Sequence, residues 1–429
     1  MSEYEFVEEV KEDEAYELMM TPGVKSHFLG SEAWARVSSK RNWTPYRVGV
    51  RKDGKLAATA LLLKKNLVRG YTYFYIPRGF VMDYSDRELL RETTKMVDAF
   101  CRRHKSLYFK IDPDIKLFDI DAEGRPVEGG EDNTDLVTDL VKMGFKHKPL
   151  NYLFDGQQPR FTFRIATDRD IEDVKAGYEK IVKRRLKQAA ADGVEIVEGT
   201  RDEIPEFVRL MTMTEKRQGF YAHDTSYYQF FYDILKEYDM VDLYFAKIDI
   251  PKLVSQLEEE LVSLAEEKAK FAEQTSKKAA GKVKTIEEKI KADERQLASL
   301  KEGPQEVLTT SAQLLVTYAG KVWTLYAGND MDYGKFYSNY AMFGFCVEEA
   351  VRRGAKFLDA FGTVGKTGLD PALDGLHEFK KRWGGEYTEF VGEFDFVQNK
   401  PMYFLYSKLI PIYHKRVNKK LRKKVQEDA

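Results

Sequence analysis

The chain has 429 residues, of which 43% are hydrophobic, so it can fill the cores of two domains. It lacks an apolar run of about 18 residues, which argues against a membrane-spanning helix. Lys and Arg (69) nearly balance Asp and Glu (70), so any affinity for nucleic acid or membrane must come from local patches.

The opening stretch, MSEYEFVEEVKEDEAYEL, is acidic and does not have the basic and then apolar pattern of a signal peptide. We therefore expect a cytoplasmic protein. Cys101 and Cys346 lie far apart in apolar helical contexts, which predicts buried thiols in a reducing compartment and no disulfide or zinc framework.

Residues 1–155 are predicted to form an α+β domain of the acyltransferase type. Tyr46–Val50 and Leu56–Leu63 alternate around the turn Lys52–Lys55, which is typical of a β-hairpin. The predicted strand, helix and strand that follow are Tyr71–Ile76, Arg87–Arg103 and Ser106–Ile111.

Residues 156–400 are predicted to form a second domain of the same type, which begins at the phrase QQPR. Its first helix, Tyr178–Gln188, leads to a strand at Val194–Val197. This helix is rich in cations, namely Lys180, Lys183, Arg184, Arg185 and Lys187. With no acidic residue after Glu179, these side chains suggest a phosphate-binding patch, although helical geometry leaves some of them merely solvated.

Residues 252–301 have a different composition, dominated by Glu, Lys, Ala, Gln and Leu, and are predicted to form a coiled-coil hairpin with its turn at Thr275–Lys282. Each helix, of about 22 residues, would project roughly 33 Å. The flanking strands, Val241–Ile248 and Ala312–Tyr318, are predicted to pair with each other. The hairpin is therefore an insertion, serving either as a spacer or dimerisation arm or as a contact for RNA.

Beyond the arm, Trp323–Ala327, an aromatic-rich amphipathic helix and Phe357–Phe361 predict a β-α-β unit. Most of its aromatic side chains are expected in the core. A cationic, aromatic cluster, Phe379–Trp383, then precedes a turn at Gly384 and Gly385. The tail, residues 401–429, is predicted to form a basic amphipathic helix that either packs on the first domain or lies along phosphates or the inner membrane face.

Other chemistries have little support in the sequence. The motifs GxGxxG, GxxxxGK[ST], HExxH and GxSxG are absent, and the histidines lack metal-ligand spacing. Arg352–Ala355 imitates only in part the turn that binds the pyrophosphate of coenzyme A. We therefore expect neither a catalytic metal nor a cofactor.

Several phrases occur together in a specific order: FLGSEAWARV, YIPRGFVMD, FKIDPDI, QPR, LYAGNDMDYGKFYSNYAMFGFCVEEAVRRGAKFLDAFGTVG and GLHEFKKRWGGEYTEFVGEFD. Over nearly the whole chain the sequence resembles the FemABX peptidyltransferases, which build the interpeptide bridges of peptidoglycan with aminoacyl-tRNA as donor. The resemblance implies two acetyltransferase-like (GNAT) domains with the helical hairpin inserted in the second. It also implies two partners, aminoacyl-tRNA and a peptidoglycan precursor, either lipid II or UDP-MurNAc-pentapeptide.

The reaction implied by this resemblance is aminolysis of an activated ester, which requires alignment, proton transfer and oxyanion stabilisation. The resemblance places Lys380 at the transfer site, where its ammonium would stabilise the oxyanion while Phe379 stacks on the terminal adenosine. Asp112 matches a family aspartate beside the active cleft; alternatively, an Asp before Pro only initiates a turn.

The substrate-binding residues implied by the resemblance begin with Arg36, which stands where the family has a lysine that contacts the nucleotide-linked muropeptide. Lys40 lies nearby, and a guanidinium can hold a phosphate through two hydrogen bonds. Arg185 and Lys187 are the neighbours of a muropeptide-binding position in the family's basic helix. The expected substrate-binding residues are Arg36, Lys40, Arg185, Lys187, Tyr326 and Tyr340.

Two alternatives remain at this point. A non-catalytic RNA-binding or scaffold protein could use the same fold and the arm, and a coenzyme A dependent N-acyltransferase would bind acyl-CoA. Transfer of a labelled amino acid from charged tRNA to a peptidoglycan precursor separates them.

Overall fold

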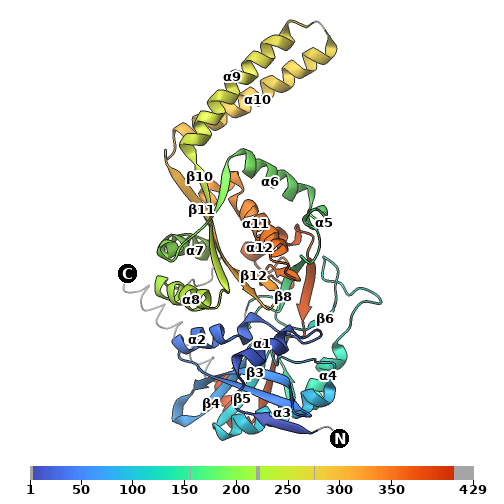
Figure 1. Ribbon diagram of the computed structural model, residues 1–429. Helices are drawn as coiled ribbons and strands as arrows, with labels where there is room; N and C mark the ends of the chain where they lie inside the picture. The colour runs from blue at the N-terminus through green and yellow to red at the C-terminus, as the bar shows by residue number, and fades with distance from the viewer. Residues whose placement is uncertain (1–2, 155, 219–222, 275, 410–429) are drawn as a thin grey trace.

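The computed structural model describes residues 3–154, 156–218, 223–274 and 276–409. Two β-sheets with flanking helices form the α+β body, and a helical hairpin projects from one end of it (Figure 1). No helix among the described residues is long and apolar enough to cross a membrane. Cys101 and Cys346 are buried free thiols, as predicted.

The first sheet has the strand order β1-β2-β3-β4-β5-β15-β7. Its strands are β1 (Tyr4–Val7), β2 (Thr44–Lys52), β3 (Lys55–Asn66), β4 (Thr72–Ile76), β5 (Ser106–Ile111), β7 (Phe145–His147) and β15 (Phe394–Val397). The predicted β2–β3 hairpin is confirmed: Asp53 and Gly54 have φ values of 52° and 80°, the left-handed pair that a tight hairpin turn requires.

The second sheet has the strand order β6-β14-β8-β13-β12-β11-β10-β9. Its strands are β6 (Lys116–Asp119), β8 (Phe161–Ala166), β9 (Val194–Glu198), β10 (Val241–Asp249), β11 (Val307–Tyr318), β12 (Lys321–Asn329), β13 (Phe357–Asp359) and β14 (Glu386–Phe390). The α-helices that flank these two sheets are α1 (Glu12–Met20), α2 (Glu32–Lys40), α3 (Arg87–Arg103), α4 (Thr134–Lys142), α5 (Ile171–Ala176), α6 (Lys180–Ala191), α7 (Ile204–Gln218), α8 (Thr225–Glu237), α11 (Ser338–Arg352) and α12 (Pro371–Lys381).

The same topology occurs in both sheets. An antiparallel hairpin is followed by an antiparallel strand, a helix and a parallel strand, as β2-β3-β4-α3-β5 and again as β10-β11-β12-α11-β13. The predicted α+β fold with two acetyltransferase-like domains is therefore confirmed.

Two short strands cross the predicted division at residues 155 and 156. β6, from the first half of the chain, pairs with β14 in the second sheet, and β15, from the second half, lies between β5 and β7 in the first sheet. The linear boundary is therefore wrong for these strands. The exchange ties the two domains together, because each sheet needs a strand from the other half of the sequence.

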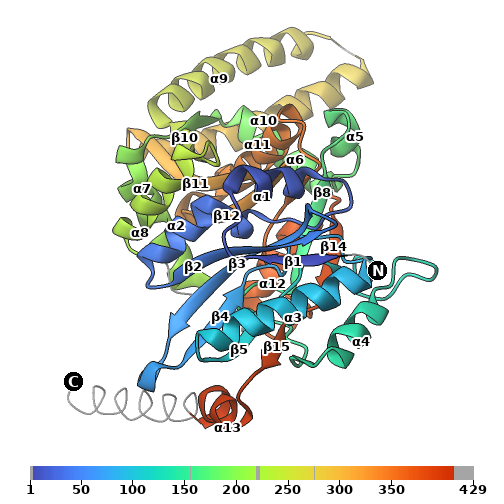
Figure 2. The same ribbon diagram turned by 60° about the horizontal axis from the view of Figure 1, so that its bottom comes forward.

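The three largest apolar clusters of the described residues support the two sheets. The first lies between the first sheet and α3 and α4, with Phe74, Phe100 and Phe109 at its centre. The second sheet is covered on one face by α7 and α8 and on the other by α6 and α11. Phe28 and Val37, from the first half of the chain, pack into the α7–α8 core, so α2 bridges the domains (Figure 2).

The arm consists of α9 (Ile250–Ala272) and α10 (Lys277–Lys301), and it interrupts the antiparallel β10–β11 pair as predicted. The predicted turn is placed too late, because Lys277–Lys282 already belong to α10, where Ala279 is buried against the partner helix. Ser276 caps this helix through the amide of Ala279. At the base, Leu257, Leu300 and Phe336 pack together and fix the arm to the body.

The described start of the C-terminal segment lies against the first domain. α13 (Lys400–Phe404) follows β15 at the edge of the first domain (Figure 2). The Tyr403 ring contacts the Tyr108 ring edge to face, and the Tyr403 hydroxyl donates to Asp395 on β15 at 2.7 Å. The basic helix predicted for 401–429 falls largely on residues 410–429, which lie outside the described residues.

Candidate active site

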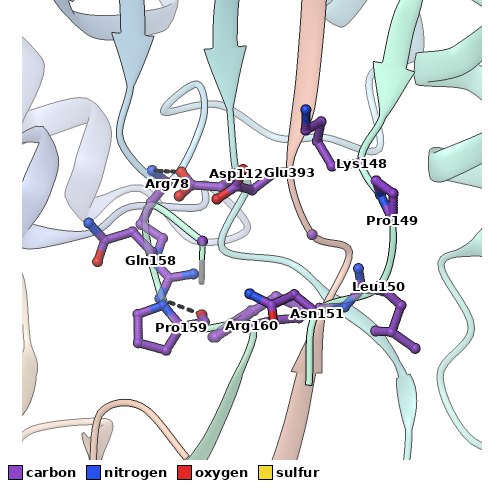
Figure 3. Close-up of a pocket in the computed structure, with 13 residues that line it drawn as sticks. Arg78, Asp112, Lys148, Pro149, Leu150, Asn151, Gln158, Pro159, Arg160 and Glu393 are labelled. Atoms are coloured by element: carbon purple, nitrogen blue, oxygen red, sulfur yellow. Dashed lines mark hydrogen bonds between the residues drawn. The ribbon is translucent and has the colours of Figure 1, made fainter. Parts of the chain in front are cut away.

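A cavity of about 300 Å³ lies between the two domains, and Figure 3 shows the side chains around it. Its wall comes from the ends of β4 and β5, the connection between the two halves of the chain, and the turn after β14. The lining residues are Arg78, Asp112, Lys148, Pro149, Leu150, Asn151, Gly156, Gln158, Pro159, Arg160, Phe390, Gly392 and Glu393. Of the residues predicted for the site, Asp112 is the one in this wall.

Asp112 is 4% exposed and accepts two hydrogen bonds. The Tyr75 hydroxyl donates to Oδ2 at 2.8 Å, and the backbone N–H of Arg78 donates to Oδ1 at 2.6 Å. The pKa of Asp112 is raised to about 7, because burial and, to a smaller extent, the nearby charge of Glu393 outweigh the lowering effects of the Arg78 charge and of the hydrogen bonds from Tyr75 and the Arg78 amide. A carboxyl group with a pKa close to neutrality can accept and return a proton at physiological pH.

The turn that holds Asp112 has an unusual backbone conformation. Arg78 is a non-glycine residue with a left-handed φ of 58°, and Gly79 follows at 78°. A Cβ on Gly79 would lie 2.5 Å from the Tyr84 hydroxyl, so only glycine fits there. The Arg78 guanidinium lies over the Phe390 ring and donates to the Pro159 carbonyl at 3.2 Å. Arg78 therefore connects the first domain to the second at the cavity wall.

A buried ionic network lies beside this wall. The Arg164 guanidinium on β8 donates to Asp114 at 2.5 Å and to Asp359 at 2.9 Å, and its charge lies over the Phe390 ring. Burial alone would raise the pKa of Asp114, but the neighbouring cations, Arg164 first, hold it below its ordinary value. Unlike Asp112, Asp114 is therefore a permanently charged anchor between the domains.

Lys380 does not line the cavity but lies behind its wall. It is 9% exposed, and its ammonium donates to the carbonyls of Phe361 at 3.0 Å and Gly362 at 2.6 Å. Burial lowers the pKa of Lys380 to about 7. Gly362 in turn packs on Pro159 in the wall, where an added Cβ would lie 2.6 Å from the Pro159 ring.

The loop that Lys380 holds is also strained. Phe361 has a left-handed φ of 57°, and the Asp359 carboxylate accepts its N–H at 2.8 Å. Strain of this kind persists only where the surroundings enforce it. The site therefore contains two such turns, one at Arg78 and one at Phe361, on either side of Pro159.

Three predicted residues meet in the second domain. The Arg185 guanidinium on α6 lies 4.9 Å from the centre of the Tyr340 ring, and Tyr340 contacts Phe379 edge to face at 5.0 Å. Phe379 is half-buried and also contacts Trp383. Lys187 is exposed on another side of α6 and is not part of this group.

The other predicted residues lie around α2 and β12. Arg36 is paired with Glu237 on α8, and Lys40 is exposed at the end of α2. The Tyr326 hydroxyl lies 3.0 Å from that of Tyr227, and the Arg41 guanidinium covers the Tyr227 ring at 5.4 Å. Tyr326 is therefore next to a cation, but that cation is Arg41 rather than Arg36.

Sequence reasoning missed Arg78 and Arg41. Arg78 lies within the phrase YIPRGFVMD, and the Pro-Arg-Gly triplet was an available turn signal. Arg41 directly follows Lys40, but only the fold brings Tyr227 beneath it. Arg217, at the end of α7, reaches β12, the strand that carries Tyr326, since its guanidinium lies 3.5 Å from the Asn329 carbonyl.

Comparison with known proteins agrees with the resemblance in the sequence. The model of the FemAB family matches residues 13–410. The lipid II:glycine glycyltransferases of Staphylococcus aureus strains RF122 and USA300 are each 30% identical over 420 residues, covering 94% of this chain and 97% of theirs. The crystal structure of FemX is similar at 28% identity and a TM-score of 0.76, covering 94% of this chain and 99% of that one. The chain therefore belongs to the FemAB family.

Proposed function

We propose that this protein transfers an amino acid from aminoacyl-tRNA to an amine of a peptidoglycan precursor and so builds part of an interpeptide bridge. Family membership and the glycyltransferase activity in the names of the Staphylococcus aureus relatives support the reaction class. Lipid II, which those names specify, is the preferred acceptor over a nucleotide-linked precursor. An acceptor with a lipid anchor would place the enzyme at the inner face of the cytoplasmic membrane.

The observation that carries this proposal is Asp112, a carboxyl group with a pKa of about 7 in the wall of an interdomain cavity. In the proposed step the acceptor amine attacks the ester carbonyl of the donor and a C–N bond forms. The amine proton passes to Asp112. The tetrahedral intermediate then collapses, the bond to the ribose oxygen breaks, and the released ribose hydroxyl receives the proton from Asp112.

Lys380 is the proposed cation for the oxyanion. An ammonium has three N–H donors, and its contacts with Phe361 and Gly362 occupy two of them. The third donor is the one that we assign to the oxyanion of the transition state. Since its pKa is about 7, Lys380 would be charged below neutrality and increasingly neutral above it.

Donor and acceptor are assigned to different groups of residues. Phe379 and Tyr340, with Arg185 beside them, form the aromatic surface proposed to position the terminal adenosine of the donor. For the acceptor, we assign its phosphates to the cations on and directly after α2, namely Arg36, Lys40 and Arg41.

Transfer of radiolabelled amino acids from a panel of charged tRNAs to lipid II and to UDP-MurNAc-pentapeptide tests the proposal. Product should form with at least one pair, and its formation should require both substrates. Acyl transfer from coenzyme A without tRNA would favour the N-acyltransferase alternative. Binding of RNA without any transfer would favour the non-catalytic one.

A further inference from the structure

A second concave surface lies on the outer side of the second domain, away from Asp112. A cavity of about 830 Å³ is bounded by α5, α6, β9 and α11, and its size is within the range of ligand sites in proteins. Leu186, Ile196 and Phe345 provide apolar lining. The charged lining residues are Lys175, Lys183, Glu172 and Glu348, and Lys175 is paired with Glu348 at 2.9 Å and with Glu172 at 3.6 Å, so Lys183 is the cation of this wall without a carboxylate partner among the described residues. In Figure 1, α6 runs between α5 and the base of the arm.

One face of α6 is entirely cationic. Lys180, Lys183, Arg184 and Lys187 follow the spacing i, i+3, i+4, i+7, which places four side chains on one side of a helix over about 10 Å. All four are exposed, whereas Arg185 turns to the opposite side and contacts Tyr340. We call these four residues the α6 cationic face.

The α6 cationic face is not neutralised within the described part of the chain. None of its four side chains forms an ion pair there, and the two acidic residues that flank the helix have other partners. Glu179 faces Arg382 at 3.8 Å, and Asp192 accepts hydrogen bonds from Gln188 and Gln296. On the arm, by contrast, cations are paired across the two helices, as Lys268 is with Glu287 at 2.8 Å. A positive potential therefore persists at α6 but is largely cancelled along the arm.

The position of these cations does not favour the helix itself. Lys180 and Lys183 lie in the first turns of α6, which has no acidic residue in its first turn and no basic residue in its last. Cations at a helix N-terminus oppose the helix dipole and therefore carry an energetic cost. A bound anion would remove that cost.

We infer that the α6 cationic face and the adjoining cavity bind the donor RNA, with phosphates on the four cations and one unpaired nucleoside in the cavity. This rests on the proposed tRNA dependence. RNA fits better than a membrane, because the apolar side chains line a recess in which Phe345 can contact a base, whereas a membrane contact needs protruding apolar groups. The Tyr178 hydroxyl in the same wall is buried without a hydrogen-bond partner among the described residues.

The test compares two four-residue variants of the full chain. One changes the α6 cationic face to glutamine. The matched control changes four other exposed cations, three lysines and one arginine on the first domain, to glutamine: Lys11, Lys55, Arg91 and Lys142. Binding of uncharged tRNA is measured by fluorescence anisotropy at several salt concentrations, and the melting temperature of each variant checks that it is folded.

The α6 variant should bind tRNA at least about tenfold more weakly than wild type near 0.1 M salt. The slope of log K against log salt concentration should be smaller by up to about three, since each phosphate contact contributes about 0.7 to 0.9 to it. The control should stay within about threefold. Equal loss in both variants would overturn the inference, and so would unchanged tRNA binding with weakened binding to anionic phosphatidylglycerol vesicles.

Filling the cavity tests the second half of the inference. Ala341→Phe places a ring among the lining residues and leaves the α6 cationic face intact. It should weaken tRNA binding without changing the salt slope. Wild-type affinity in a folded variant would contradict the placement of a nucleoside in the cavity. Because uncharged tRNA is the probe, these results do not depend on transfer. Failure of the proposed function would appear instead as normal tRNA binding with no product.

Discussion

Replacing Asp112 with asparagine is the most informative single change, because the structure predicts both its chemical and its structural effect. The asparagine side chain would keep one hydrogen bond from the Arg78 amide, and its own amide would donate to the Tyr75 hydroxyl, so the turn should survive. What the variant loses is the ability to take a proton. We expect kcat to fall by about 10²- to 10⁴-fold, the range of a lost general base.

The same change should alter stability in a predictable direction. The rise in the Asp112 pKa from its ordinary 3.8 to about 7 corresponds to about 4 kcal/mol of preference for the protonated carboxyl group in the folded state. The wild type should therefore lose stability as the pH rises from about 4 to about 7, with the cost fully present above pH 7. The Asp112→Asn variant should lack this loss and be the more stable protein at pH 8 by up to a few kcal/mol.

The assay is single-turnover transfer at saturating charged tRNA, combined with urea unfolding at pH 5 and pH 8. In the wild type the rate should rise with pH up to about 7 as Asp112 ionises and decline above it as Lys380 loses its charge, and in the Asp112→Asn variant the rise should be absent. A variant rate within threefold of wild type, or an unchanged rise with pH, would refute the assignment of Asp112 as the base.

The remaining predictions concern Lys380, the acceptor cations and the arm. Lys380→Ala should lower kcat by about 10²-fold or more with little change in acceptor KM. Lys380→Arg stays charged, so it should restore part of the rate and remove the decline in rate expected above pH 7. A decline that persists in Lys380→Arg would contradict this role. Arg41→Ala should raise acceptor KM more than Arg36→Ala does, because Arg36 is already paired with Glu237 while Arg41 lies on an aromatic ring. Steady-state kinetics with each substrate varied in turn measures both KM values, and the reverse order would assign the phosphates to Arg36. Joining Leu261 to Arg295 through a short Gly-Ser loop removes the outer arm and keeps its base. The shortened protein should unfold cooperatively and have a tRNA KM within threefold of wild type. A large rise in that KM would mean that the outer arm contacts RNA.

Local sequence patterns predicted much of the fold. The Asp53-Gly54 turn and the α3 helix depend on residues close in sequence, and the structure confirms them. The β10–β11 pair is also confirmed, because the distinct composition of the arm marks it as an insertion between two strands. The exchange of β6 and β15 between the sheets was not predictable in this way. Each strand is short, and its partners lie in the other half of the chain, so its position follows from tertiary packing.

The site could be predicted only in part, for a similar reason. Asp112 and Lys380 lie in recognisable sequence motifs, but their pKa values near 7 arise from burial, which no local sequence pattern specifies. The surroundings of Lys380 depend on the left-handed turn at Phe361, whose carbonyl accepts a hydrogen bond from the Lys380 ammonium. Arg185 could not be separated from its cationic neighbours until α6 was oriented with that one side chain against Tyr340.

The central claim is that the protein moves an amino acid from tRNA to a peptidoglycan amine. Its most direct test follows a ¹⁴C-labelled amino acid from charged tRNA to lipid II with purified wild-type protein and with the Asp112→Asn variant as control. The account predicts a labelled lipid product whose new amide bond resists the mild alkali that cleaves aminoacyl-tRNA, formed at least 10²-fold more slowly by the variant. If no charged tRNA in a complete panel gives a labelled precursor, lipid-linked or nucleotide-linked, the account is contradicted.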